Sequence, residues 1–411
     1  MDYINRAAEK LAKEAVETYK SILVTGARQT GKSTMLEELF PDRKVVTFDD
    51  QFAEDQAKNN PTEFIDLNPP PVTYDEVQYV PSLFRYIKIA CDASKDTGLF
   101  CLTGSQPFKL MKTASESLAG RVSIIELSTL SLREMQKTDF DQSFVPTMEY
   151  VKARQKSAKK PKNIWSIIHR GGYPALQNPK MNCERFFSDY IKTYLERDVR
   201  ALSAVQDLNT FRRFMIACAA RTGQMLNYSN IASEISKDAD TVKNWISILE
   251  ASGIIYILEP YCPSVLNRAI KTPKLYFRDT GLACYLTRWL TPETLANGAM
   301  AGEIFETYVI SEILKSYSNA GIDYHYCVSY YRGKDKKNSS ESEIDFLIEK
   351  DGLLYPVEIK KTSKPAADMT SAFTILDNIP EKKRGTGAVV CMCSAPGVLR
   401  ENILAIPVWY V

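Results

Sequence analysis

The chain lacks the cysteine pattern of a disulfide-bonded or a zinc-binding protein. Its nine cysteines include no CxxC pair and follow no regular spacing, so we expect reduced thiols. It also lacks any apolar run that approaches the roughly 18 residues of a membrane span. Residues 1–20 form a charged amphipathic pattern without the apolar core of a signal peptide. These absences predict a soluble, cytoplasmic protein that makes no membrane contact.

A strong excess of one charge is missing as well. The formal net charge is +2 over 411 residues, which gives no general attraction to nucleic acid or to acidic membranes. Any basic contact surface must therefore be local. A chain of this length and ordinary composition is expected to fold into roughly two to four domains.

What the chain does contain is a phosphate-binding pattern. The strand-forming residues Ser21–Thr25 lead into the spacing GxxxxGK(S/T), and a helical pattern follows. Gly26 and Gly31 permit the backbone angles that place N–H groups around a phosphate, and the helix adds its positive dipole end. Lys32 is expected to reach the β- and γ-phosphates, and Ser33 to hold Mg²⁺. An ordinary glycine turn is the alternative, but the flanking strand and helix favour a site for ATP with Mg²⁺. The expected lining is Gly26, Ala27, Arg28, Gln29, Thr30, Gly31, Lys32, Ser33 and Thr34.

Residues 1–140 alternate between strand and helix patterns. After the phosphate loop, the expected strands are Lys44–Phe48, Pro71–Tyr74 and Leu99–Thr103. Such alternation is typical of a parallel sheet with helices on both faces. The sequence therefore predicts an α/β fold whose N-terminal part is a P-loop core.

An acidic pair follows one of these strands, in Asp75-Glu76-Val77-Gln78. This is the appearance of a Walker B element, in which Asp75 would bind Mg²⁺ through water and Glu76 would polarise the water that attacks the γ-phosphate. A surface turn can carry the same dipeptide, but the apolar strand before it favours the catalytic interpretation.

Two more polar residues are candidates for contact with the triphosphate. Ser105, at the end of a strand, would sense the γ-phosphate or cap a helix. Arg121, which follows a glycine, would act as an arginine finger on a neighbouring subunit or form a surface salt bridge. Both pairs of alternatives stay open, and a finger acting in trans implies a homo-oligomer.

These motifs carry a family resemblance. GARQTGKST, DEVQ, LTGSQ and ESLAGRV resemble the uncharacterised prokaryotic AAA-type ATPases that carry a C-terminal domain of unknown function. Gly171–Pro174, Tyr190–Asp198 and Tyr276–Gly281 are similar to other marker stretches of that family, so the resemblance covers the chain from about Ser21 onward. It implies an AAA-like ATPase core, a winged-helix middle and a nuclease-like C-terminal fold. It implies no settled biological task.

The middle of the chain offers a basic stretch and a helical region. Residues 151–162 hold six basic and no acidic residues, which is typical of a solvated linker, with phosphate contact as the alternative. Helices are expected over 185–205.

Leu226–Tyr256 has helix-turn-helix periodicity. We expect a short helix from Ser229, a second helix capped by Asp240, and a strand-like wing after Gly253. A winged helix often reads DNA. The outward face offers one cation, Lys243, so a packing or subunit-docking role remains the alternative.

Near the C-terminus, two alternating segments flank Asp351-Gly352, a strong hairpin signal. A two-residue turn there sets Asp345 opposite Glu358 and Glu343 opposite Lys360, all on one face. The other face is expected to be apolar, with Ile344, Phe346, Ile348, Tyr355, Val357 and Ile359.

The charged face is similar to the PD-(D/E)xK nuclease signature. Asp345 and Glu358 would hold Mg²⁺ or Mn²⁺, and Lys360 would stabilise charge on the phosphate or position the attacking water. The family's preceding helix offers Glu306 as a further ligand. A solvent-exposed set of ion pairs is one alternative, and a nuclease fold that binds DNA without cutting it is another.

Two functions of different class follow. The first is an ATP-hydrolysing AAA-type ATPase that acts on or with DNA, through a C-terminal domain that binds DNA and could cleave it. The alternative is a regulatory nucleotide switch that docks partner proteins. The expected domains are an ATPase domain at 1–150, a linker with helices at 151–205, a winged helix at 206–270, a connector at 271–299 and a nuclease-like domain at 300–411.

Overall fold

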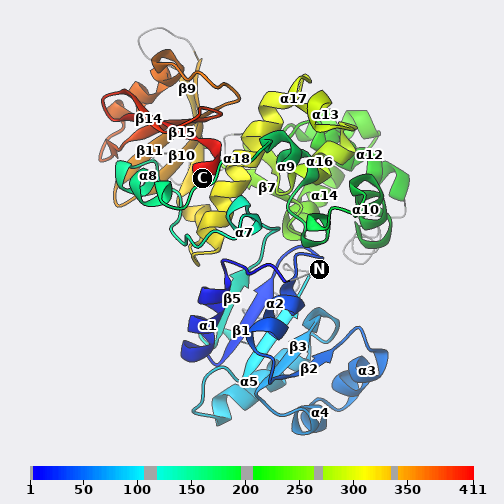
Figure 1. The fold of residues 1–411 in the computed structure, drawn as a ribbon. Coiled ribbons are helices and arrows are strands. Elements are labelled where there is room, and N and C mark those ends of the chain that lie inside the picture. The colour runs from blue at the N-terminus through cyan, green and yellow to red at the C-terminus, as the bar shows by residue number, and fades with distance from the viewer. Residues whose placement is uncertain (1–2, 106–117, 196–206, 263–271, 335–340) are drawn as a thin grey trace.

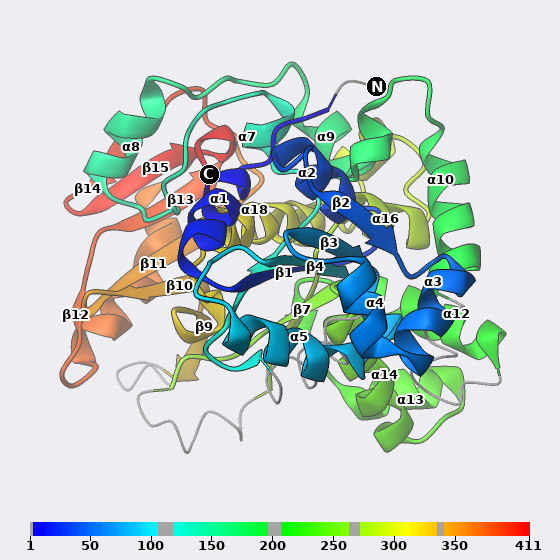
Figure 2. The same cartoon turned by 90° about the horizontal axis from the view of Figure 1, so that it is seen from below.

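The computed structural model describes residues 3–105, 118–195, 207–262, 272–334 and 341–411. They form an N-terminal α/β unit, a mostly helical middle unit and a C-terminal sheet, with the long helix α18 between the last two (Figure 1). The α/β unit lies below the other two units in this view, and Figure 2 shows it from its own side.

The N-terminal unit is built on a five-stranded parallel sheet. Its strand order is β2-β3-β4-β1-β5, so the strand that precedes the phosphate loop lies inside the sheet. The strands are β1 (Ser21–Thr25), β2 (Lys44–Thr47), β3 (Val72–Asp75), β4 (Phe100–Gly104) and β5 (Val122–Glu126). The helices are α1 (Glu9–Thr18), α2 (Lys32–Leu39), α3 (Gln51–Asn59), α4 (Pro61–Leu67), η1 (Val77–Tyr79), α5 (Leu83–Ala93) and α7 (Leu132–Met135).

The two faces of this sheet carry separate apolar cores. Ile22 and Val24 of β1 pack with α1 and α2, whereas Leu23 between them packs with α4 and α5 on the other face. This alternation follows from the two-residue period of a strand. The predicted parallel sheet with helices on both faces is confirmed.

The middle unit combines helices with a small antiparallel sheet of order β6-β8-β7. Its strands are β6 (Gln224–Met225), β7 (Ile255–Leu258) and β8 (Lys274–Phe277). Its helices are α9 (Ile164–Arg170), η2 (Pro174–Gln177), α10 (Cys183–Tyr190), η3 (Ile191–Leu195), α12 (Leu208–Ala219), α13 (Tyr228–Ile235), α14 (Ala239–Ala251), α16 (Thr280–Leu286) and α17 (Pro292–Ala296). Helix α8 (Met148–Gln155) precedes them in the chain but lies against the C-terminal unit, where Tyr150 donates to the carbonyl oxygen of Tyr410 at 2.8 Å (Figure 1). The winged-helix assignment for residues 206–270 remains a prediction. The boundary expected at residue 270 cuts through this sheet, because β8 lies after it.

Two local expectations between residues 151 and 256 were wrong. The cap of α14 is Asp238, which accepts the N–H of Thr241 at 2.7 Å, while Asp240 lies within the first turn. The start of the basic stretch is helical and packed, because α8 runs to Gln155 and Arg154 is fully buried against the carbonyl of Trp409. The helices expected over 185–205 are present to residue 195, and 196–206 lie outside the described residues.

The C-terminal unit is a mixed sheet of order β14-β15-β13-β11-β10-β9, with β12 paired to β11. Its strands are β9 (Val328–Lys334), β10 (Glu341–Lys350), β11 (Leu353–Lys360), β12 (Lys383–Arg384), β13 (Gly387–Cys391), β14 (Gly397–Arg400) and β15 (Ile403–Pro407). Its helices are α18 (Ala301–Ser318), η4 (Tyr324–Tyr326), η5 (Ala367–Asn378) and η6 (Val408–Tyr410).

The predicted β10–β11 hairpin is present in the expected register. Phe346 pairs with Val357 and Lys350 with Leu353, and both turn residues have left-handed backbone angles, with φ of +52° at Asp351 and +76° at Gly352. One side-chain assignment was wrong. A register shift against β9 between Ile344 and Leu347 turns Ile344 to the side of Leu347, away from Phe346. Such a bulge moves one residue to the opposite face.

Candidate functional site

The phosphate loop joins β1 to α2, and its backbone takes left-handed angles at three positions. The φ angles are +138° at Gly26, +57° at Gln29 and +91° at Gly31. At Gly26 space also excludes a side chain, because a Cβ atom would lie 2.2 Å from the carbonyl oxygen of Leu127. The glycines of the pattern are therefore required by this backbone.

Lys32 begins α2 and folds its side chain back into the loop. Its ammonium group donates to the carbonyl oxygens of Gly26 at 3.2 Å and Ala27 at 3.0 Å, and the residue is buried. Phosphate oxygens are stronger acceptors for an ammonium group than amide carbonyls are. This position therefore suits a lysine that binds phosphate.

Asp75 ends β3 and meets hydroxyl groups from three neighbouring elements. It accepts hydrogen bonds from Ser33 at the start of α2, from Thr103 on β4 and, at 3.3 Å, from Thr47 on β2. Thr47 is its direct neighbour in the sheet register. Carboxylate and hydroxyl oxygens are hard ligands of the kind that Mg²⁺ prefers. Ser33 and Asp75 thus fit the predicted ion chemically.

Glu76 lies beside this group but has different partners. Its carboxylate accepts hydrogen bonds from Ser105 at 2.7 Å and from the amide of Gln78. Burial alone would raise the pKa of Glu76, but the charge of Lys32 and the hydrogen bonds from Gln78 and Ser105 hold that pKa below its usual value. Glu76 is therefore ionised at neutral pH.

The sequence predicts a role for Ser105 but none for Gln78. Ser105 was expected to sense phosphate or to cap a helix, and the structure places it, fully buried, against Glu76. Gln78 donates to Ser105 at 3.3 Å as well as to Glu76. Its role was missed, although its place two residues after Glu76 was a possible signal.

Arg121 lies at the opposite end of the strands from the phosphate loop. Its carbonyl oxygen accepts the N–H of Ser21, the first residue of β1, and five residues of strand separate that end from the loop, about 17 Å. Its guanidinium group is bound to Asp92 at 2.5 and 3.2 Å. The structure thus contains the salt bridge that the sequence left open, and it does not bring Arg121 to Lys32 and Glu76 of the same chain.

Arg6, which the sequence did not single out, clamps the loop from outside. It donates to the carbonyl oxygens of Thr30 and Ser128, each at 2.7 Å, and forms a buried ion pair with Glu134 at 3.0 Å. One side chain thereby ties the phosphate loop to the segment after β5.

The middle unit packs against the same end of the sheet. Arg278 pairs with Glu126, the last residue of β5, and with Tyr324, while Asp279 accepts the N–H of Gly172 at 2.8 Å. The marker stretches Gly171–Pro174 and Tyr276–Gly281 therefore meet next to the phosphate loop. A small cavity there is lined by residues that include Gly26, Ala27, Glu126, Gly253, Arg278 and Asp279.

A second charged group lies in the C-terminal unit. The ammonium group of Lys360 is 2.8 Å from the carboxylate of Asp345 and 2.7 Å from that of Glu358. Burial and the nearby charge of Asp345 raise the pKa of Glu358 to about 9, although Lys360 acts in the other direction. The three predicted residues thus lie together on one face.

Residues from α18 and from the middle unit extend this cluster. Lys274 of β8 is buried between Glu306, at 3.5 Å, and Glu343, at 2.5 Å, and Tyr276 donates to Glu306 at 2.6 Å. Burial and the charge of Asp345 raise the pKa of Glu306 to about 7. Lys274 and Tyr276 were missed because they come from a different unit of the chain.

These carboxylates are paired with lysines. Among the described residues there is no group of three or more His, Cys, Asp or Glu side chains arranged to hold a metal ion. Glu306, Asp345, Glu358 and Lys360 remain a predicted site for a divalent ion.

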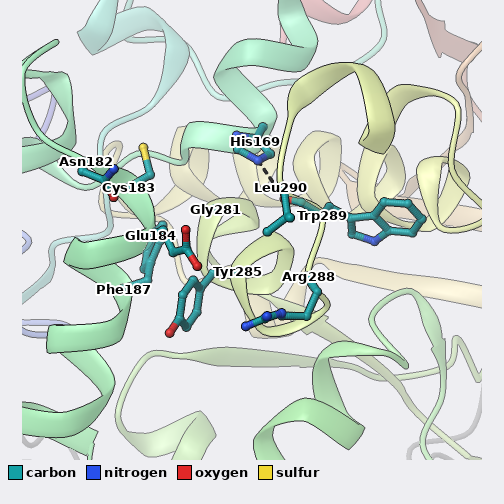
Figure 3. Close-up of a pocket in the computed structure, with 10 residues that line it drawn as sticks. All are labelled: His169, Asn182, Cys183, Glu184, Phe187, Gly281, Tyr285, Arg288, Trp289 and Leu290. Atoms are coloured by element: carbon teal, nitrogen blue, oxygen red, sulfur yellow. Dashed lines mark hydrogen bonds between the residues drawn. The ribbon is translucent and has the colours of Figure 1, made fainter.

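A pocket of about 200 Å³ lies elsewhere, over α9, α10 and α16. Figure 3 shows its lining, in which His169 is bonded to the carbonyl oxygen of Trp289 at 2.8 Å. Cys183, Tyr285 and Arg288 also line it, and it shares no lining residue with the phosphate loop or the carboxylate cluster.

Three family models match successive parts of the chain. An AAA domain matches residues 18–136, a domain of unknown function (DUF8612) matches 161–293, and another (DUF4143) matches 301–411. The AAA domain and the C-terminal domain of unknown function are the parts that the sequence resemblance named. That resemblance is confirmed.

Similar proteins extend over most of the chain. Two uncharacterized proteins, from Mycobacterium bovis and Mycobacterium tuberculosis, are each 25% identical over 375 residues, which is 90% of this chain and 77% of theirs. Among solved structures, a Walker-type ATPase of Pyrococcus abyssi has 14% identity and a TM-score of 0.45, over 69% of this chain and 96% of that one. AMPPCP-bound DnaA of Aquifex aeolicus has 17% identity and a TM-score of 0.30, over 61% and 89%.

In the part of the chain that the structure describes, no helix combines the length and the apolar character needed to cross a membrane.

Proposed function

For a chain that joins an AAA domain to two domains of unknown function, we propose ATP binding with Mg²⁺ and ATP hydrolysis. The observation that carries this proposal is the meeting of Lys32, Ser33, Asp75 and Glu76 at one end of the parallel sheet. A phosphate loop, a pair of hard oxygen ligands and an ionised carboxylate are the parts that γ-phosphoryl transfer to water requires.

The roles follow from the contacts. Lys32 binds β- and γ-phosphate oxygens, and Ser33 with Asp75 would hold Mg²⁺, which supplies positive charge to those oxygens. Glu76 accepts a proton from water as the water oxygen bonds to the γ-phosphorus. The bond from that phosphorus to the β–γ bridging oxygen breaks, and ADP leaves with the electron pair, so the products are ADP and inorganic phosphate.

Two substitutions test this proposal by separating binding from chemistry. Lys32→Ala should weaken both nucleotide binding and turnover, because the lysine meets phosphates in the ground state. Glu76→Gln should keep ATP bound and lower kcat by a factor on the order of a hundred or more. The matched control is Glu63→Gln on the exposed face of α4, which should change neither quantity. Turnover at the wild-type rate by Glu76→Gln would remove the catalytic assignment.

We further propose DNA as the partner of the C-terminal unit. Support comes from the face that holds Asp345, Glu358 and Lys360, because its spacing resembles a nuclease signature and Lys360 is partly exposed. A nucleotide switch that docks partner proteins is the alternative. Cleavage is a separate question, since the carboxylates are paired with lysines.

Mobility shifts with single-stranded, duplex and branched DNA, with ATP and with ADP, distinguish a DNA-binding unit from a switch that docks partner proteins. Lys360→Ala should weaken DNA binding roughly tenfold by removing one charge-assisted phosphate contact. Lys361→Ala, next to it and exposed, is the matched control. If no DNA structure shifts in either nucleotide state, the partner-protein alternative is favoured. Incubation of the same DNA with Mg²⁺ or Mn²⁺ tests cleavage.

A further inference from the structure

The proposed hydrolysis leaves room for positive charge beyond that of Lys32 and Mg²⁺. In phosphoryl transfer, negative charge spreads over the three equatorial oxygens of the γ-phosphoryl group, and many such enzymes add an arginine at that point. If the proposed function holds, on which this inference rests, an arginine of this chain is expected to act there.

Three arginines of the N-terminal and middle units are placed unfavourably for this role. Arg121 lies at the far edge of the sheet, bound to Asp92. Arg6 is buried in its contacts with Glu134 and the loop carbonyls, and Arg278 is bound to Glu126 and Tyr324. Moving Arg6 or Arg278 would break contacts that hold the phosphate loop and the middle unit in place.

Arg28 is placed differently, because it belongs to the phosphate loop itself. It lies between the left-handed positions Gly26 and Gln29, and its side chain is half-buried. Its guanidinium group donates to the phenol oxygen of Tyr79 at 3.1 Å. The side chain therefore extends from the loop across to η1, the segment that follows Glu76.

This contact places the arginine on the side of the loop where the chemistry is proposed to occur. Tyr79 is three residues after Glu76 and one after Gln78, which binds the Glu76 carboxylate. The charges of Lys32 and Arg28 both contribute to the low pKa of Glu76, which agrees with this proximity. Lys32 approaches from the start of α2, and Arg28 from the loop next to η1.

We infer that Arg28 is the arginine that stabilises the γ-phosphoryl transition state, in cis, and that Tyr79 positions it. Arg28 neither gains nor loses a proton in the step; it donates N–H groups to oxygens whose negative charge grows as the bond to the bridging oxygen breaks. Because the charge comes from the same chain as the phosphate loop, turnover per molecule does not require a neighbouring subunit.

Steady-state kinetics and transition-state trapping together test the role of Arg28. Arg28→Gln should lower kcat by a factor on the order of a hundred or more, and should change the affinity for a fluorescent ATP analogue less than about threefold. The wild type should trap ADP with aluminium fluoride, and Arg28→Gln should lose that complex. Arg28→Lys should recover part of the turnover, and Tyr79→Phe should lower kcat less than Arg28→Gln does. Arg85→Gln, on the exposed face of α5, is the matched control.

Each outcome decides the matter. Full turnover by Arg28→Gln overturns the inference, and so does a loss of ATP affinity equal to the loss of kcat/KM, which would mean ground-state phosphate binding only. Loss of turnover in Arg121→Ala, with kcat rising with protein concentration and Arg28→Gln active, would assign the charge to a neighbouring subunit. A wild type that binds ATP but does not hydrolyse it would overturn the proposed function, and the inference with it.

Discussion

Lys32, Ser33, Asp75 and Glu76 could be predicted as single side chains because each is tied to a short, local pattern. Their partners could not be predicted in this way. Ser105 reaches Glu76, and Thr103 reaches Asp75, only because β4 lies beside β3 in the sheet. Strand order is set by packing across the whole sheet, so a pattern within one segment does not contain it.

The hydrogen bonds to Glu76 lead to a prediction about pH. Gln78 and Ser105 donate to the ionised carboxylate and so lower its pKa. Replacing Gln78 with Leu should raise that pKa toward its usual value. Since the base must be ionised to accept a proton, the acidic limb of the kcat/KM profile should move to higher pH in Gln78→Leu, with the rate at alkaline pH less affected. A profile that drops equally at every pH would mean that Gln78 acts on structure alone.

Among secondary-structure elements, the β10–β11 hairpin was the most predictable, and the pairing of β10 with β9 was the least predictable. The Asp351-Gly352 turn fixes the register from two residues, because a two-residue loop leaves few choices. The bulge that redirects Ile344 depends on β9, which pairs from a separate part of the chain. The cap of α14 was misplaced by two residues because both Asp238 and Asp240 are suitable cap residues.

The turn gives a stability prediction with a matched control. Gly352 has a φ of +76°, and a Cβ there would meet no atom within 4 Å, so Gly352→Ala should cost about 1 kcal/mol through backbone strain alone. Gly302, in the first turn of α18, also has free space for a Cβ. Gly302→Ala should therefore stabilise the chain by up to about 1 kcal/mol, because alanine is the better helix former. Urea unfolding of both variants measures the difference, and destabilisation by Gly302→Ala would contradict the argument.

At the scale of the whole molecule, α18 connects the C-terminal carboxylate cluster with the segments next to the phosphate loop. Glu306 near its start lies in the C-terminal carboxylate cluster, and Ser311 in its middle donates to the carbonyl oxygen of Arg278 at 2.7 Å. Near its end, Glu312 accepts the N–H of Leu132 at 2.7 Å, and Lys315 donates to the carbonyl oxygen of Leu130 at 3.0 Å. The sequence showed α18 only as a helix with one candidate ligand. Its contacts with three units follow from the tertiary fold.

The ion pair of Lys274 and Glu306 should hold the middle unit and α18 together, and it can be compared with a partly exposed pair. Lys274→Met leaves Glu306 and Glu343 without the lysine that lies between them, which should cost up to roughly 3–5 kcal/mol in the unfolding transition that includes α18, measured at a pH above the pKa of Glu306. Adding Glu306→Gln should restore part of that loss, because the uncompensated charge is then removed. The partly exposed pair Lys382 and Glu349 is the control, and Lys382→Met should cost much less than Lys274→Met does.

Amide hydrogen exchange along α18 measures the local stability of the helix. A local measurement is needed because a chain of several domains need not unfold in one step. Lys274→Met should lower protection from Ile304 to Ile310, where the helix meets β8, and Lys382→Met should not. If Lys274→Met proves as mild as the control, Glu306 takes up a proton in place of the lysine, as its raised pKa permits. The double variant would then gain nothing over Lys274→Met, and the two units would be held by their shared apolar core rather than by charge.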